Sequence, residues 1–238
     1  MNELACLKAV IDADPIRYLD LTQPLARGTG QVVDADAQGA LVRVALAGGG
    51  DHYTLSAQTE QRAAELIALL PEDPGYVTWH EELCWPLLQK RFGYPGCNFC
   101  WQTAYMSASP IPVPEHAFTL RALDESFYPA VRAQYTLIGD DDLMKTLQRH
   151  DVIGAFDGDT LAGFMGWHDD GTLGLLEVYP AYRRRGLASL LEAHIVNLEL
   201  SRGFIPYAQI FEDNLPSLAL QISLGCQRSR GPVYWPKS

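Results

Sequence analysis

The segment VYPAYRRRGLAS, residues 178–189, constrains the fold of this chain more than any other stretch. The residues before it, GTLGLLEV, are typical of a strand, and the residues after it carry apolar side chains at helical spacing. We therefore predict a strand that ends at Val178, a short loop, and a helix that begins near Gly186 and covers residues 187–202. A strand, a loop and a helix in this order are typical of α/β proteins.

The same loop has the chemistry of a phosphate-binding site. The first turn of a helix has unpaired N–H groups and the positive end of the helix dipole. Gly186 and Ala188 let a ligand approach that backbone closely, and Arg183, Arg184 and Arg185 add positive charge and forked hydrogen-bond donors. We predict a pyrophosphate site here. The alternative is a solvated basic loop before a surface helix.

Length and charge limit the remaining possibilities. The chain has 238 residues and a formal net charge of −11. Its acidic balance argues against a nucleic-acid partner and favours small molecules, cationic ones among them. The sequence contains no recognisable signal peptide and no apolar run long enough for a membrane helix, so we expect no membrane partner and a cytoplasmic location.

The five cysteines are few and odd in number, which suits a reducing compartment, and for the pair Cys97 and Cys100 we expect ordinary buried thiols. Cys97 and Cys100 form a single C-x-x-C motif, and no second ligand pair at similar spacing completes a zinc site. The residues that follow, WQTAYMS, are aromatic and strand-prone, so we expect this pair to enter a strand.

A proline-rich segment, SASPIPVPEH at residues 107–116, indicates a linker. It divides the chain into an N-terminal α/β companion domain, residues 1–110, and a second domain, residues 116–238.

The second domain has a clear order of predicted elements. We expect a strand at AFTLRAL, short helices capped by Asp124 and Asp140, and three strands across residues 151–178. The helix at 187–202 stops before Gly203. A strand at FIPYAQIF, a helix capped by Asn214 and a short strand at PVYWP complete the chain.

Two motifs of this domain resemble the GNAT N-acetyltransferase superfamily. The loop fits its pattern [QR]-x-x-G-x-[GA], and NLPSLALQISLGC resembles its pattern N-x-x-S-x-x-L-Y-x-x-L-G-F. The resemblance covers residues 118–236 and is closest to the glycine-N-acyltransferase-like subgroup, whose members carry an extra N-terminal domain. The matching residues of the second motif are Asn214, Ser217, Leu220, Leu224 and Gly225.

This resemblance implies a mixed central sheet flanked by helices, an acyl-CoA donor and transfer of its acyl group to an amine. We expect acetyl-CoA as donor and a small-molecule amine, such as an amino acid or polyamine, as acceptor. The backbone N–H groups near Val178 are expected to polarise the thioester carbonyl. The predicted cofactor-binding residues are Val178, Arg183, Arg184, Arg185, Gly186, Leu187, Ala188, Ser189, Asn214 and Ser217.

The predicted chemistry needs a base, because an amine near pH 7 must lose a proton before it attacks a thioester. Glu177, beside Val178, is the first candidate, and on the opposite face of the strand it would be a solvated residue. His168 is the second candidate, although a hairpin histidine is usually only exposed. The tyrosine that often protonates the leaving thiolate in this family is Gln221 here. Either another group serves or the thiolate leaves unassisted, and a non-catalytic acyl-CoA-binding protein is the alternative function.

The first domain shows a weaker pattern that echoes the second at an offset of 132 residues, as Gly39 and Gly171 illustrate. We expect either a degenerate GNAT-like copy or an unrelated α/β domain. At this offset the counterpart of the arginine loop is a loop that contains Asp51 and His52, which would repel phosphate. We therefore expect one coenzyme A per chain. The predicted elements are a strand at GALVRVAL, a loop at AGGGDHYTLS, a helix at AQTEQRAAELIALL, a strand at YVTWH, a helix at EELCWPLLQKRFG and a strand at FCWQTAYMS.

Overall fold

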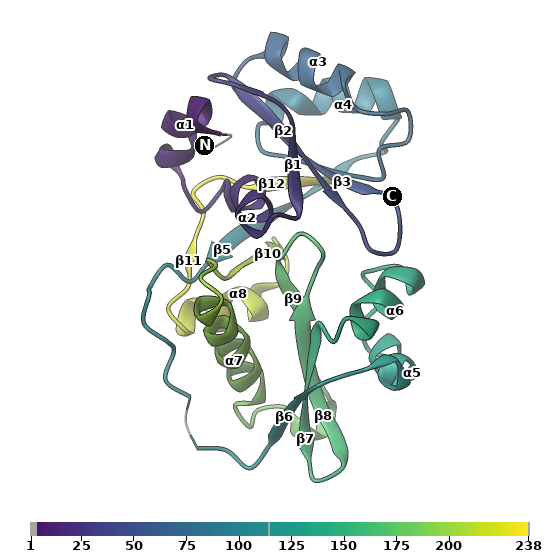
Figure 1. The fold of residues 1–238 in the computed structure, drawn as a ribbon, viewed down its shortest axis with the longest axis vertical. Coiled ribbons are helices and arrows are strands. Elements are labelled where there is room, and N and C mark those ends of the chain that lie inside the picture. Colours follow the sequence, from purple (N-terminus) through teal and green to yellow (C-terminus); the bar gives the residue numbers. More distant parts are fainter. Residues whose placement is uncertain (1–3, 114, 238) are drawn as a thin grey trace.

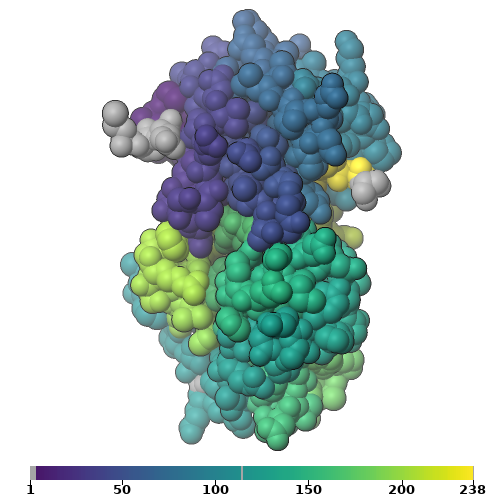
Figure 2. Space-filling view, turned by 45° about the vertical axis from the view of Figure 1, so that its right-hand side comes forward, coloured from purple at the N-terminus to yellow at the C-terminus, as the bar shows by residue number. Residues whose placement is uncertain are grey.

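Two sheets organise the chain in a computed structural model that describes residues 4–113 and 115–237. The larger sheet has the order β1-β2-β3-β4-β12-β5-β10, with β11 paired to β5, and the smaller has the order β6-β7-β8-β9. In Figure 1 most of the first half forms the upper body, which β12 joins from the second half, and the rest of the second half forms the lower body. Figure 2 shows the two bodies packed directly against each other.

The smaller sheet consists of the four antiparallel strands that the sequence predicts. Helices cover both of its faces: α7 lies on one, and α5 and α6 lie on the other (Figure 1). The strands are β6 (Thr119–Ala122), β7 (Val152–Asp157), β8 (Thr160–Trp167) and β9 (Leu173–Val178). The helices are η3 (Glu125–Phe127), α5 (Tyr128–Arg132), α6 (Asp140–Gln148), η4 (Pro180–Tyr182) and α7 (Leu187–Ser201).

Helix α7 packs on the sheet through its apolar face. Leu187, Leu191 and Ile195 are buried in one cluster with Ala162 and Met165 of β8. The helix ends as predicted, because Gly203 adopts the left-handed conformation with a φ of 81°. Beyond it lie β10 (Tyr207–Phe211), α8 (Leu215–Ser223), β11 (Gln227–Arg228) and β12 (Val233–Pro236).

The caps of the shorter helices differ in part from prediction. Asp124 caps η3, since its side chain accepts a hydrogen bond from the Ser126 N–H. The prediction for Asp140 is wrong: Gly139 occupies the N-cap and Asp140 lies in the first turn, where its carboxylate pairs with Arg132 instead. An acidic residue in a first turn still interacts favourably with the helix dipole.

The first half contains more structure than the sequence predicts. Elements η1 (Ala5–Leu7), α1 (Lys8–Ala13), α2 (Leu19–Arg27) and β1 (Gly30–Asp36) were not predicted. The predicted loop at residues 47–56 is wrong, because β3 (Asp51–Ala57) begins there and is buried along most of its length. The other elements are β2 (Gly39–Ala45), α3 (Glu60–Ala68), β4 (Tyr76–Trp79), η2 (Glu82–Cys84), α4 (Trp85–Phe92) and β5 (Cys97–Ala104).

The order of elements in the first half repeats that of the second. The series β3, α3, β4, α4, β5 matches the series β9, α7, β10, α8, β12. The predicted offset of 132 residues is wrong for the first of these strands, because it sets β2, which begins at Gly39, and not β3, against β9. Gly93 and Gly225, the pair at the predicted offset, both have positive φ angles and follow the matching helices α4 and α8. This repetition favours the degenerate copy over an unrelated α/β domain.

The two halves exchange their last strands. Strand β5, from the first half, pairs with β10 of the second half, and β12, from the end of the chain, pairs with β4 and β5. Between β5 and β6 the chain is irregular over the described residues, and the segment runs down one side of the molecule (Figure 1). The proposed division at this segment therefore separates two units that share the larger sheet, to which the second half contributes β10, β11 and β12.

Candidate active site

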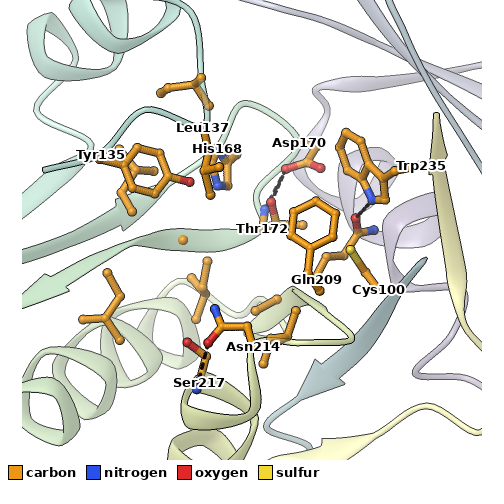
Figure 3. A pocket seen from close by; sticks show the side chains of 18 of the residues that line it. Cys100, Tyr135, Leu137, His168, Asp170, Thr172, Gln209, Asn214, Ser217 and Trp235 are labelled. Atoms are coloured by element: carbon orange, nitrogen blue, oxygen red, sulfur yellow. Dashed lines mark hydrogen bonds between the residues drawn. The ribbon is translucent and has the colours of Figure 1, made fainter. Parts of the chain in front are cut away.

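A cavity of about 660 Å³ lies where the two sheets separate. Strand β9 is the last strand of the smaller sheet and β10 is the last strand of the larger one, so the two neighbouring strands diverge. Residues of β9 and β10 line the cavity, together with residues of α7, α8 and the first half. Figure 3 shows three of the hydrogen bonds around it, which join Asp170 to Thr172, Trp235 to Gln209 and Asn214 to Ser217.

A bulge in β9 alters the backbone at the cavity wall. The register between β8 and β9 shifts between Phe164 and Gly166, and Leu175 has a φ of 55°, which is unusual for a residue with a side chain. Beyond the bulge, the Tyr179 N–H donates to the Ala162 carbonyl of β8. Because antiparallel strands alternate their hydrogen bonds, the N–H of Val178 points away from β8, toward the gap.

The loop after β9 presents the predicted basic residues at the start of α7. Gly186 is the N-cap residue with a φ of 76°, and Arg184 also has a positive φ, of 62°. Arg183 donates from Nε to the Val178 carbonyl at 3.0 Å, so it also holds the loop in shape. The Arg185 guanidinium lies 5.4 Å from the centre of the Tyr182 ring.

Helix α7 begins with free backbone donors. No side chain caps it, and its first intrahelical bond runs from the Leu190 N–H to the Gly186 carbonyl. The N–H groups of Leu187, Ala188 and Ser189 therefore have no acceptor within the helix. Over residues 4–113 and 115–237, the three arginines form no salt bridge with a carboxylate. Free amides and unpaired cations at one helix start together suit an anion.

The second motif lies against the cavity. Asn214 caps α8, since its side-chain oxygen accepts a hydrogen bond from the Ser217 N–H at 3.3 Å. Both side chains line the cavity. The structure therefore gives Asn214 a structural role in addition to its predicted place near the cofactor.

Glu177 also lines the cavity, as the prediction of a base requires. Burial raises the pKa of Glu177 above its usual value, and nearby Arg183 opposes this shift. A carboxylate with a raised pKa is a stronger base, which suits proton abstraction from an amine. Glu177 is half-buried, so the alternative of a fully solvated strand residue does not apply.

His168 lies on the same cavity, in the hairpin between β8 and β9. Its ring packs against the backbone of Gly174, where an added Cβ would come within 2.2 Å of Nε2. Burial lowers the pKa of His168, and Asp170 and Asp169 partly oppose this shift. The ring is neutral near pH 7 and can accept a proton, so His168 remains the second candidate base.

Three further polar residues of the cavity were not predicted. Tyr135, between α5 and α6, is buried, and burial raises its pKa to about 12. Glu192 on α7 is 1% exposed and accepts a hydrogen bond from Gln221 at 2.9 Å. Gln221 in turn accepts a hydrogen bond from Thr103 of the exchanged strand β5. No periodic pattern marks these residues, because the packing of distant elements brings them to the cavity.

The first half supplies one wall of the cavity. His52 and Tyr76 of this half form a ring cluster with Trp235 of β12 from the second half, with His52 and Trp235 centred 5.3 Å apart and Tyr76 and Trp235 centred 6.5 Å apart. Asp170 lies 3.7 Å from His52 across the boundary between the two halves. The carboxylates of Asp142, Asp169 and Glu177 also face this cavity, which gives it an acidic lining.

The corresponding position in the first half is closed. Strands β3 and β4 pair in parallel, from His52 with Tyr76 to Leu55 with Trp79. Only residues 58 and 59 separate β3 from α3, and Thr59 caps that helix with its own side chain. The prediction that Asp51 and His52 lie at the strand-to-helix turn is wrong, because both residues begin β3.

Two other findings concern the described part of the chain. No group of three or more histidine, cysteine or acidic side chains there is arranged to hold a metal ion. None of the helices described is long and apolar enough to cross a membrane. Cys97 and Cys100 are free thiols in β5, as predicted, and burial raises the pKa of both.

Comparisons with known proteins agree with this architecture. Residues 117–225 match the model of the Acetyltransferase (GNAT) family. A structure of a Drosophila protein is 18% identical, with a TM-score of 0.67, over 94% of this chain and 88% of that one. A GCN5-related N-acetyltransferase from Kribbella flavida is 10% identical, with a TM-score of 0.59, over 94% of both chains. One from Sphaerobacter thermophilus is 16% identical, with a TM-score of 0.55, over 99% of this chain and 90% of that one. No curated protein matches significantly.

The fold is thus GNAT-like: a mixed α/β arrangement whose central sheet is flanked by helices. Residues 117–225 are similar to the GNAT acetyltransferase family, whose members in general use acyl-CoA donors, and the structural neighbours share the fold. The glycine-N-acyltransferase-like subgroup stays a prediction.

Proposed function

We propose that this protein is an N-acyltransferase that transfers an acetyl group from acetyl-CoA to the amine of a small molecule, such as an amino acid or a polyamine. The observation that carries the proposal is the gap between β9 and β10, which holds the Glu177 carboxylate, together with the free amides and the arginines at the start of α7, the helix that follows β9. A cytoplasmic location stays part of this proposal.

Two groups of residues would bind the two parts of the acyl-CoA donor. The free amides at the start of α7 and the arginines of the loop would hold the pyrophosphate. The amide-containing arm of the cofactor would enter the gap, where the open edge of β9 offers backbone groups for pairing. The Val178 N–H, which points into this gap, would polarise the thioester carbonyl and stabilise the negative charge that develops on its oxygen.

The lining of the cavity supports an amine as acceptor. Asp142, Asp170 and Glu177 contribute negative charge, Asp169 is paired with Arg149, and Lys237 is the one lysine or arginine among the lining residues. An acidic cavity attracts a protonated amine, and Glu177 would then remove a proton so that nitrogen can attack. The aromatic wall formed by Tyr76 and Trp235 would limit the size of the acceptor.

The test is release of free thiol from acetyl-CoA in the presence of single amines from a panel of amino acids and polyamines. Thiol release that depends on one class of amine supports the proposal. Binding of acetyl-CoA by calorimetry without thiol release from any amine would support the alternative, a non-catalytic acyl-CoA-binding protein. No binding at all would contradict both.

A further inference from the structure

Glu192 is a buried carboxyl group that the proposed reaction has not yet used. It lies in the second turn of α7, about 9 Å along the helix axis from the anion site at Gly186. Its side chain lines the same cavity as Glu177 but projects from a different element. The residue is 1% exposed, and no cation pairs with it over the described residues.

A short chain of hydrogen bonds holds this carboxyl group in place. The Gln221 side chain donates from Nε2 to Glu192 Oε1, and the Thr103 hydroxyl donates to Gln221 Oε1. Because Thr103 occupies the amide oxygen, the amide nitrogen of Gln221 is directed at Glu192. Gln221 and Thr103 are themselves buried, so the chain is shielded from solvent.

We infer that Glu192 donates a proton to the sulfur of the leaving thiolate, and that Gln221 and Thr103 position its carboxyl group. This inference rests on the proposed function, and it assigns the group that completes the departure of the cofactor. Glu192 would be a catalytic residue, whereas Gln221 and Thr103 would act through it.

The proton and electron count is balanced by two carboxyl groups. The amine nitrogen forms a bond to the thioester carbon, and the carbon–sulfur bond breaks with its electron pair on sulfur. Sulfur takes the proton of Glu192, and the nitrogen, whose first proton Glu177 has already passed to solvent, gives its second proton to Glu177. The products are an amide and a free thiol. Exchange with solvent then returns a proton to Glu192 and removes one from Glu177.

The acidities of the cavity residues single out Glu192 among the possible donors. Burial raises the pKa of Glu192 to about 7, and the hydrogen bond from Gln221 only partly opposes this shift. A substantial fraction of Glu192 is therefore protonated at neutral pH, and it is more acidic than an alkyl thiol, whose pKa is about 8.5. Tyr135 has a pKa of about 12, so proton transfer from it to a thiolate is unfavourable by about three orders of magnitude.

The test compares two acyl donors in Glu192→Gln, which keeps the shape of the side chain and an oxygen that can accept from Gln221. With acetyl-CoA and the amine that the panel identifies, we expect kcat to fall roughly hundredfold. Phenyl thioacetate releases a more acidic thiol that needs no proton donor. With this donor the variant should be within about threefold of the wild type. An equal loss with both donors, or no loss with acetyl-CoA, would overturn the inference.

The pH dependence separates proton donation from a structural effect. In the wild type, kcat should decline as the pH rises through the raised pKa of Glu192, because the donor loses its proton. Glu192→Gln should lack this decline, and Glu192→Asp should keep it at a lower rate. Thr103→Val should lower kcat less than Glu192→Gln and should also keep the decline. A decline of the same size in Glu192→Gln would overturn the assignment.

The proposed function and the inference about Glu192 would be contradicted by different results. If the wild type releases no thiol with any amine, the proposed function fails and the inference falls with it. If the wild type is active and Glu192→Gln matches it in rate and pH profile, only the inference fails. Calorimetry with acetyl-CoA and a thermal melt on each variant verify that binding and folding are intact.

Discussion

The anion site at the start of α7 permits a test in which only one charge changes. Gly186 has a φ of 76°, and a Cβ added there would meet nothing within 4 Å. Asparagine and aspartate both tolerate this left-handed conformation better than other residues with a side chain. Gly186→Asn and Gly186→Asp therefore share the same steric and conformational cost, and they differ by one negative charge beside the expected pyrophosphate.

The charge has a calculable effect. Two unit charges 4 Å apart interact by about 1 kcal/mol in water and about 4 kcal/mol at an effective dielectric constant of 20. Gly186 is exposed, so the lower end applies to each charge pair, and because a pyrophosphate carries two negative charges we expect a difference of at least about 1.4 kcal/mol between the two variants. The Kd of coenzyme A should then be at least tenfold higher in Gly186→Asp than in Gly186→Asn.

Titration calorimetry at low salt measures this difference directly. Salt screens a repulsion between exposed charges, so the difference in Kd between the two variants should decrease at about 0.5 M salt. The difference in Kd between Gly186→Asn and the wild type should change less. Equal affinities of the two folded variants at low salt would refute the pyrophosphate site at this helix.

Three further predictions follow from other parts of the structure. Glu177→Gln should lower kcat roughly hundredfold while acetyl-CoA affinity stays within about twofold. The variant should also lack the loss of rate that the wild type shows as the pH falls through the raised pKa of Glu177. Normal turnover of the variant would assign the role of base to His168. Calorimetry should give one coenzyme A per chain, because the strands of the first half that correspond to β9 and β10, namely β3 and β4, are paired and leave no gap for a second cofactor. A stoichiometry of two would contradict this. Arg27→Met should lower the free energy of unfolding by about 3 kcal/mol in urea, because it leaves the buried Glu199 carboxylate with only Arg202; a loss under 1 kcal/mol would show that Arg202 suffices.

The second half could be predicted closely because its signals are local. Asn214 caps α8 and Gly203 stops α7, as their residue types indicate, and the turns DGD and DDG separate β7, β8 and β9. The positions of Glu177 and His168 on the cavity follow from the same strands. Each of these features depends on residues that are close together in the sequence.

The remaining features depend on residues far apart in the sequence. Glu192 belongs to a helix, where an acidic residue ordinarily faces solvent, and its burial results from packing near α8 and β5. Strand β3 was missed because three glycines and Asp51 precede its apolar residues and resemble a loop. Helix α1 has only six residues and none of them is buried, so it offers no periodic pattern to detect.

The exchange of β5 and β12 has a consequence for how the chain is made. Residues 105–232 separate the two strands, so at about 5–20 residues per second the ribosome needs roughly 6 to 26 seconds to produce β12 after β5. During this interval β4 and β5 lack the strand that joins them, and open strand edges favour association with other chains. The four residues Val233–Pro236 emerge after the other strands described, and only then can the sheet of the first half close.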